Sequence, residues 1–263
     1  MQVLPPPQSN LSPMSKRVLL IIAHPDDEMH IAGTLALQAA AGMEVTIAVA
    51  SSGNLGGAPE LTKEDRAAVR RLEMQESCAT LGARLEWLGY GDDNLTGEYY
   101  GNNPAMEAAI RSVLRRVDPD LILIPALDDY HKHHRLVAEV ALNASSNASN
   151  PTVITEDPPS RAIPTTLHLP PMPPGVFSAD IYVDISSTFE QKMAALRCHK
   201  SQYEYLQSHH RTDIFQQIEA AAITHGVACG VQYAEVLSFC RRFNRPATIQ
   251  RLAGFFPALK GAL

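Results

Sequence analysis

Short aliphatic runs alternate along the chain with longer stretches in which apolar residues recur at helical spacing. The expected strands are 17–23, 44–50, 84–88 and 121–125, and the expected helices are 27–42, 62–82, 104–117 and 131–143. Nearly continuous aliphatic runs are typical of strands that are covered on both faces. The alternation of strands and helices therefore predicts an α/β fold, with a Rossmann-like, mostly parallel sheet and helices on both of its faces.

The rhythm of strands and helices is interrupted in the second half of the chain. Residues 143–178 hold many of the 19 prolines and a cluster of Asn and Ser, so we expect an irregular excursion near the active face. Regular structure is expected again in a strand over 179–185 and a long helix over 187–207, with helices and loops beyond. The predicted organisation is a flexible, proline-containing tail, residues 1–15, followed by one domain, residues 16–263.

Composition excludes several classes of protein. Hydrophobic residues make up 45% of the chain and charged residues 19%, which is ordinary for a globular protein and untypical of a disordered one. The formal net charge is −6 and no block of Lys and Arg stands out, so no nucleic-acid partner is expected. No apolar run reaches the roughly 18–20 residues that a membrane span requires, so no span is expected either.

Two further features favour a cytoplasmic location. The N-terminal residues contain no apolar core, so they do not have the pattern of a secretory signal. The four cysteines, Cys78, Cys198, Cys229 and Cys240, are scattered and form no CxxC pair. We expect them to be free thiols in a reducing compartment.

Two polar segments follow expected strands. Residues 23–28 (AHPDDE) come directly after the first strand, and residues 128–134 (DDYHKHH) come just after the strand that ends at Pro125. Ligands of open parallel sheets bind outside the carboxyl ends of the strands. We therefore expect the fold to bring the two segments together, although many residues separate them.

The residue types in these segments suit a catalytic metal site. Such a site needs three protein ligands, drawn from His nitrogen and carboxylate oxygen, and an open position for water. His24 and Asp27 are three residues apart at a strand-to-helix turn, so both can face one point. One histidine of the second segment would complete the set. Zinc suits such ligands, and other divalent ions accept them too.

Hydrolysis of an amide also requires a base for the attacking water and an acid for the leaving amine. Asp26 lies beside Asp27, so one carboxylate can bind the metal while the other takes the proton. If their segment is helical, His131 and His134 share one face, and one of them can donate a proton or stabilise the oxyanion. Taken singly, the first segment could be a helix cap and the second a solvated histidine patch. The position of both at strand ends favours the metal site.

These residues resemble the signature of a known family, the LmbE-like or PIG-L zinc-dependent N-acetylglucosaminyl deacetylases. The segment AHPDDE after a hydrophobic first strand is a specific match, and His131-x-x-His134 resembles the second histidine motif of the family. Further similarities are SSGNLGG at 51–57, Arg70-x-x-Glu73 before Leu81-Gly82, and LGYGD at 88–92. The resemblance extends roughly from residue 18 to residue 240.

The resemblance implies a role for each matching residue. By position, His24, Asp27 and His134 would be the zinc ligands, Asp26 the general base, and His131 the acid or oxyanion stabiliser; Arg70 and Asp92 would hold sugar hydroxyls. Members of the family remove acetyl groups from N-acetylglucosamine units of sugars and glycoconjugates, and several are trimers or hexamers. We therefore expect a zinc-dependent deacetylase of a sugar or glycoconjugate, and the resemblance also implies a homo-oligomer.

The second histidine motif departs from the family pattern at one position. Where the family often has H-x-D-H, this chain has His133 in place of the carboxylate. The environment of His131 is therefore altered, and His133 competes with His134 as a metal ligand; we favour His134. His199, in a late H-x-S-Q segment, is expected to pack or hydrogen-bond and not to contact the metal.

Two other functions are compatible with the same residues. One is an amidase that acts on a larger acyl or thiol-conjugated sugar amide, with a pocket shaped by the excursion. The other is a metal-binding protein without catalytic activity, which the unusual His133 would support.

Overall fold

The computed structural model describes residues 15–95, 103–171, 177–242, 252 and 254–259. Its strands are β1 (Arg17–Ile22), β2 (Glu44–Ser51), β3 (Arg84–Tyr90), β4 (Leu121–Ile124), β5 (Thr165–His168), β6 (Ile181–Asp184) and β7 (Ala234–Phe239). They form a sheet in the order β3-β2-β1-β4-β5-β7-β6. The first five strands in this order are parallel, whereas β7 is antiparallel to both β5 and β6. The predicted mostly parallel α/β sheet is confirmed.

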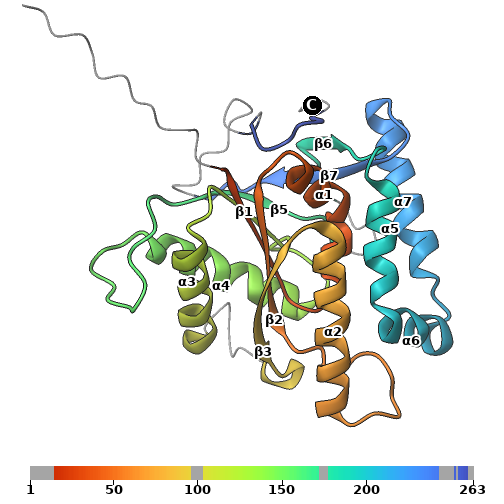
Figure 1. Ribbon diagram of the computed structural model, residues 1–263, viewed down its shortest axis with the longest axis horizontal. Helices are drawn as coiled ribbons and strands as arrows, with labels where there is room; N and C mark the ends of the chain where they lie inside the picture. The colour runs from red at the N-terminus through yellow and green to blue at the C-terminus, as the bar shows by residue number, and fades with distance from the viewer. Residues whose placement is uncertain (1–14, 96–102, 172–176, 243–251, 253, 260–263) are drawn as a thin grey trace, which may run out of the picture.

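Helices cover both faces of the sheet (Figure 1). One face carries α3 (Pro104–Val117) and α4 (Lys132–Ala148), and the other carries α1 (Ala32–Ala40), α2 (Lys63–Leu81), α5 (Phe189–Cys198), α6 (Lys200–His210) and α7 (Ile214–Cys229). Two short 3₁₀ helices, η1 (Asp27–His30) and η2 (Asp92–Asn94), follow β1 and β3. The two polar segments, residues 23–28 and 128–134, come after the ends of β1 and β4.

Strand β1 explains why its sequence is a continuous aliphatic run. Side chains alternate between the two faces of a strand. Val18, Leu20 and Ile22 belong to the apolar core beneath α1, α2 and α5, whereas Leu19 and Ile21 belong to the core beneath α3 and α4. Because both faces are covered, no position in the middle of this strand favours a polar residue.

The parallel pairing of β1 with β4 determines where the two polar segments lie. Val18 is level with Leu121, and Leu20 is level with Leu123. The chain leaves both strands at the same edge of the sheet, so residues 23–28 and residues 128–134 emerge side by side.

The expected irregular excursion, 143–178, is wrong at two places. Helix α4 continues to Ala148, and β5 lies within the excursion and pairs with β4. The Asn and Ser cluster stays helical because Ala144 and Ala148 are buried, while the Ser145 and Ser146 hydroxyls donate within the helix to the carbonyl of Leu142. Tertiary packing therefore outweighs the low helix propensity of this segment.

Two expected helices are divided. The helix predicted from Asp27 begins as η1, and α1 begins only at Ala32. The long helix predicted over 187–207 is interrupted at His199, whose ψ of 53° is not helical, so that α5 and α6 are separate. The His199 ring turns inward to a buried carboxylate, and this contact accounts for the break.

The C-terminal region holds a strand that the pattern did not predict. We expected helices and loops after residue 207, and α7 confirms the helical part, but β7 follows it and pairs with two strands. Cys240 directly follows this strand, and all four cysteines are free, as expected.

Several expectations are not decided by the fold. The expected tail, residues 1–15, lies outside the described residues except for Ser15. None of the described helices is long and apolar enough to cross a membrane. The cytoplasmic location and the homo-oligomeric state stay predictions.

A buried ion pair joins β7 to two helices. The Glu235 carboxylate accepts the N–H groups of Gly33 (2.9 Å) and Thr34 (2.7 Å) at the start of α1, where no side chain of α1 itself caps the helix. Its third partner is the Lys192 ammonium of α5, at 2.6 Å. Both charged side chains are less than 5% exposed. The pair therefore fixes α1 and α5 against the antiparallel edge of the sheet.

We predict that Lys192→Met lowers the free energy of unfolding by about 3 kcal/mol, because Glu235 is then left as an uncompensated buried charge. Urea denaturation would measure the change. The matched control is Lys200→Met, which removes the lysine of an exposed pair with Glu204, where both side chains are more than half exposed. The control is expected to change stability little. Equal effects of the two substitutions would contradict the prediction.

Candidate functional site

A cavity of about 850 Å³ opens at the carboxyl ends of β1 and β4. All seven residues that the sequence predicted for the site line this cavity: His24, Asp26, Asp27, Arg70, Asp92, His131 and His134. The fold therefore brings together side chains from the β1 exit, the middle of α2, the β3 exit and the start of α4. Leu55 and Tyr130, two of the exposed large hydrophobic residues, also line the cavity.

The turn after β1 is tightly constrained. Asp26 has φ 114°, a conformation that residues other than glycine rarely adopt. The Asp26 N–H donates to Glu28 Oε2 (3.1 Å), and the His24 N–H donates to Asp27 Oδ2 (2.8 Å). These two bonds stabilise the unusual backbone at a position where strain often marks function.

Three side chains converge on one point of the cavity. His134 Nε2 lies 3.2 Å from Asp27 Oδ1 and 3.3 Å from His24 Nδ1, and His24 Nδ1 lies 3.4 Å from Asp27 Oδ2. Two nitrogen or oxygen ligands of one tetrahedral zinc ion, each roughly 2.0–2.1 Å from it, lie roughly 3.3 Å apart. The spacing and chemistry of this group, two imidazoles and one carboxylate, therefore fit a zinc ion.

Asp129 supports this group from behind, and sequence analysis assigned it no role. Its Oδ2 lies 3.0 Å from His134 Nδ1, and its Oδ1 accepts the His131 N–H at 2.7 Å. A carboxylate on the far nitrogen of a metal-binding histidine fixes the orientation and the tautomer of the ring. The available signal was only an acidic residue five positions before His134.

Electrostatics agree with a cation at this point. Burial lowers the pKa of His134, but Asp27 and Asp129 outweigh burial and raise that pKa to about 10. Burial likewise opposes ionisation of Asp27, yet His134 and His24 hold its pKa well below the usual value. Two carboxylates thus share one imidazole, and the cluster attracts positive charge.

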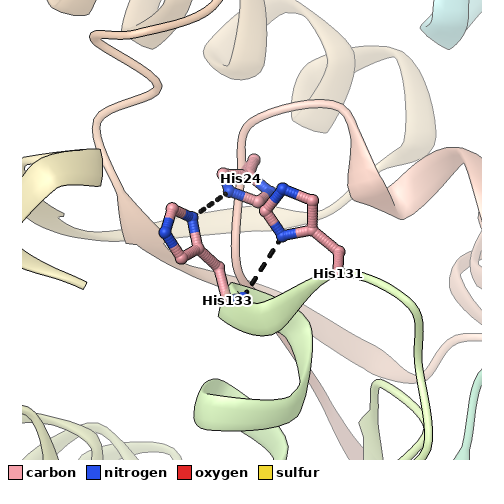
Figure 2. Close-up of side chains that lie close together, drawn as sticks. All are labelled: His24, His131 and His133. Atoms are coloured by element: carbon pink, nitrogen blue, oxygen red, sulfur yellow. Dashed lines mark hydrogen bonds between the residues drawn. The ribbon is translucent and has the colours of Figure 1, made fainter. Parts of the chain in front are cut away.

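A second group of donors lies on the other edge of His24. His24 Nε2 is 2.9 Å from His133 Nδ1, and Figure 2 shows the two rings joined by this contact with His131 beside them. The ligand atoms of His24, His131 and His133 also lie within 4.8 Å of one another. The structure therefore places His133 next to His24, on the opposite side from Asp27 and His134.

His131 lies at the start of α4. Its Nδ1 accepts the His133 N–H at 3.2 Å, so it caps the helix. Burial lowers the pKa of His131 to about 4, with a smaller contribution from His24. A neutral ring whose Nδ1 accepts a hydrogen bond carries its proton on Nε2, where it is a donor.

Asp26 stays outside the converging group but directly beside it. Burial raises the pKa of the Asp26 carboxyl to about 6, although Arg70, 3.2 Å away, lowers it in part. Ordinary aspartates have a pKa near 3.9, so this carboxyl is tuned toward neutral pH. Such a group can take up a proton in the pH range in which most enzymes work.

Arg70 is 2% exposed, and its guanidinium donates to the carbonyls of Pro25 and Gly53. The glycine-rich loop 51–57 can pack on it only because side chains are missing: a Cβ on Gly53 or Gly56 would lie within 2.6 Å of Arg70 Nη1. Gly53 also has φ 66°. The loop and Arg70 therefore hold the turn that carries Asp26.

Asp92 lies at the start of η2. Its Oδ2 accepts the Leu55 N–H at 2.8 Å, which ties it to the glycine-rich loop. Its Oδ1 is buried and has no hydrogen-bond partner among the described residues. This oxygen is the one that a ligand in the cavity could satisfy.

Glu28 and His199 form a further buried pair. The sequence pattern had indicated no role for Glu28. His199 Nε2 lies 2.5 Å from Glu28 Oε1, which also accepts the Ser77 hydroxyl at 2.6 Å. Burial raises the pKa of Glu28, but His199 outweighs it and the pKa is lowered. The expected hydrogen-bonding role of His199 is confirmed, and its partner is the residue that holds the Asp26 N–H.

Comparisons with known proteins show which proteins this chain is similar to. Residues 19–145 match the PIG-L family of GlcNAc-PI de-N-acetylases. The diacetylchitobiose deacetylase of Thermococcus kodakarensis is 27% identical over 239 residues, 85% of this chain and 83% of that protein. The 4-oxalmesaconate hydratase of Pseudomonas putida is also 27% identical, over 88% of this chain and 91% of that protein.

A solved structure has the same fold. The N,N'-diacetylchitobiose deacetylase from Pyrococcus horikoshii superimposes with a TM-score of 0.74 at 24% identity, over 86% of this chain and 84% of that one. The match over 19–145 includes both polar segments and the strands that carry them. Over residues 19–145, the chain therefore matches the PIG-L, or LmbE-like, family domain.

Proposed function

We propose that this protein is a zinc-dependent hydrolase that removes the N-acetyl group from an N-acetylglucosamine-type sugar or glycoconjugate. One observation carries the proposal: His24, Asp27 and His134 converge with contacts of 3.2–3.4 Å, in which Asp27 turns one oxygen toward each histidine, and a fourth group, Asp26, lies beside them without joining them. A purely structural zinc site has no use for a spare base. Relatives named as deacetylases of N-acetylated sugars support the substrate class.

The zinc ligands would be His24, Asp27 and His134. When bound there, zinc would lower the pKa of a water ligand from about 15.7 toward 7 and polarise the amide carbonyl. Asp129 holds the His134 ring so that Nε2 points to the other two ligands. The remaining steps depend on protons that the protein moves.

Asp26 is the proposed general base. Its raised pKa, about 6, lets the carboxylate accept a proton from water near neutral pH and release it later to the leaving amine. Arg70 holds one oxygen of Asp26, while Glu28 holds its backbone N–H. These contacts support a positioning role for Arg70; direct contact with a sugar hydroxyl stays a prediction.

His131 is the proposed oxyanion stabiliser. Its Nδ1 is occupied by the helix cap, so its Nε2–H is available to donate toward charge that develops on the amide oxygen. Asp92 Oδ1 is the proposed acceptor for a sugar hydroxyl, because it is buried in the cavity wall without a described partner.

The first prediction concerns the metal. Protein purified without chelators is expected to contain about one zinc ion per chain, and His134→Ala is expected to lose it, because a site with two protein ligands binds zinc weakly. Elemental analysis would measure this. His210→Ala, an exposed histidine outside the cavity, is the control and should retain the metal. Zinc retained by His134→Ala would assign ligation to His133, and no zinc in the wild type would remove the basis of the proposal.

The second prediction concerns the base. Asp26→Asn is expected to keep zinc and to lower kcat roughly 10²- to 10⁴-fold, because the amide cannot accept the proton. Turnover would be measured on N-acetylglucosamine, its disaccharide and glycosides, with metal content as the control. Asp128→Asn is the matched substitution in the neighbouring segment and should leave turnover unchanged. Unchanged turnover in Asp26→Asn would refute the mechanism.

The substrate panel would also separate the alternatives. Longer N-acyl and thiol-conjugated sugars test the broader amidase, and unsaturated carboxylic acids test addition of water to a double bond, since one relative is named as a hydratase. Full zinc occupancy without turnover of any compound would favour a metal-binding protein without catalytic activity.

A further inference from the structure

His133 lies where the family motif often has an acidic residue, and its two ring nitrogens have different surroundings. It is 6% exposed and belongs to the first turn of α4. Its Nδ1 lies 2.9 Å from His24 Nε2, and Figure 2 marks this contact with a dashed line. Its Nε2 is buried and has no hydrogen-bond partner among the described residues. The ring lines the same cavity as the proposed metal ligands.

The contact between His24 and His133 has the length of a hydrogen bond. At 2.9 Å it is at the usual N–H distance to an acceptor and shorter than the roughly 3.3 Å between two ligands of one tetrahedral zinc ion. The distances around His24 Nδ1, 3.3 and 3.4 Å, match the ligand spacing instead. The two edges of His24 therefore serve different purposes.

One proton arrangement satisfies both edges of His24. A neutral imidazole has one N–H and one lone pair, and a metal ligand must present the lone pair. If Nδ1 of His24 faces the metal, its proton is on Nε2 and donates to His133 Nδ1. His133, also neutral, then carries its own proton on Nε2.

We propose that His133 is a positioning residue that accepts the proton of His24 on one edge and donates to an acceptor oxygen of the substrate on the other. The first contact fixes the His24 tautomer so that Nδ1 presents its lone pair to Asp27 and His134. The second makes the buried Nε2–H a donor to a hydroxyl or carbonyl oxygen in the cavity. The inference rests on the metal site of the proposed function, and it makes His133 a partner of the ligand His24 and not a ligand itself.

Two substitutions separate the two edges. His133→Asn places an amide oxygen close to the position of Nδ1, so it keeps the acceptor for His24 but loses the N–H at the position of Nε2. His133→Leu has a similar volume and loses both. His30→Leu is the matched control, since His30 lines the same cavity but belongs to neither histidine group. Circular dichroism and thermal melting would identify any variant that fails to fold.

Zinc affinity of the metal-free protein, measured by competition with a chromophoric chelator, is the main readout. We expect His133→Leu to bind zinc 10- to 100-fold more weakly, the usual effect of losing the partner of a metal-binding histidine. His133→Asn and His30→Leu should keep the wild-type affinity. Loss of zinc from His133→Asn as well as His133→Leu would identify His133 as a ligand, and unchanged affinity in His133→Leu would show that it has no positioning role. Either result overturns the proposal.

Kinetics and spectroscopy test the remaining edge and the tautomer. His133→Asn is expected to raise KM roughly 3- to 10-fold with little change in kcat, because it loses one hydrogen bond that binds substrate and transition state equally. An unchanged KM would overturn the substrate contact.

Nitrogen-15 spectra of the histidines in the metal-free protein should show His24 protonated on Nε2 in the wild type and in His133→Asn. A His24 ring protonated on Nδ1 would overturn the inference, even if the wild type binds zinc. A His24 ring protonated on Nε2 in a protein that binds no zinc would refute only the proposed function.

Discussion

Parallel pairing between β1 and β4 is the constraint on which the site depends. Neighbouring parallel strands end at one edge of the sheet, and the level pairing of Leu20 with Leu123 brings two polar segments that are distant in sequence to the same point. The aliphatic side chains of β1 fix this pairing from both faces, because alternate residues enter separate cores. A register slip of one residue would exchange those faces and move His24 away from His134. The chemistry at the edge is thus positioned by packing in the middle of the sheet.

Three consecutive acidic residues then receive three different cationic partners. Asp26, Asp27 and Glu28 are all buried, and three adjacent carboxylates would repel one another without compensation. Arg70 of α2 faces Asp26, His134 of α4 faces Asp27, and His199 between α5 and α6 faces Glu28. Because the partners differ, so do the pKa values: that of Asp26 is raised to about 6 by burial, whereas those of Asp27 and Glu28 are lowered. These different environments suit the separate roles proposed for Asp26 as base, Asp27 as metal ligand and Glu28 as support.

The sequence was most informative where local pattern and tertiary environment agree. The continuous aliphatic strands, the helix over 62–82 and the polar segments after two strands all follow from local rules, and the structure has them at the expected places. Strand β7 was not predicted, because its sequence contains a charged residue, Glu235, that is nevertheless buried. The described partners of this carboxylate lie far away in sequence, so the local pattern does not indicate its burial. The role of Glu28 and the His24–His133 contact were not predictable for the same reason: each depends on a distance between segments, which no spacing along the chain encodes. Asp129 contacts histidines of its own segment, but an acidic residue five positions before His134 does not by itself indicate that contact.

The relatives indicate where the difference between reactions must lie. One is named as a deacetylase and another as a hydratase, and both reactions add water to an electrophilic carbon. The proposed metal group with its adjacent base would serve that shared step, so it cannot by itself distinguish the two reactions. What an amide additionally requires is stabilisation of the carbonyl oxygen and a proton for the departing nitrogen. In this chain His131 and Asp26 line the same cavity, and the Nε2–H of His131 and the proton returned by Asp26 are the proposed sources of these two contributions. The side chains that face the proposed metal group, more than that group itself, therefore favour the proposed hydrolysis of an amide.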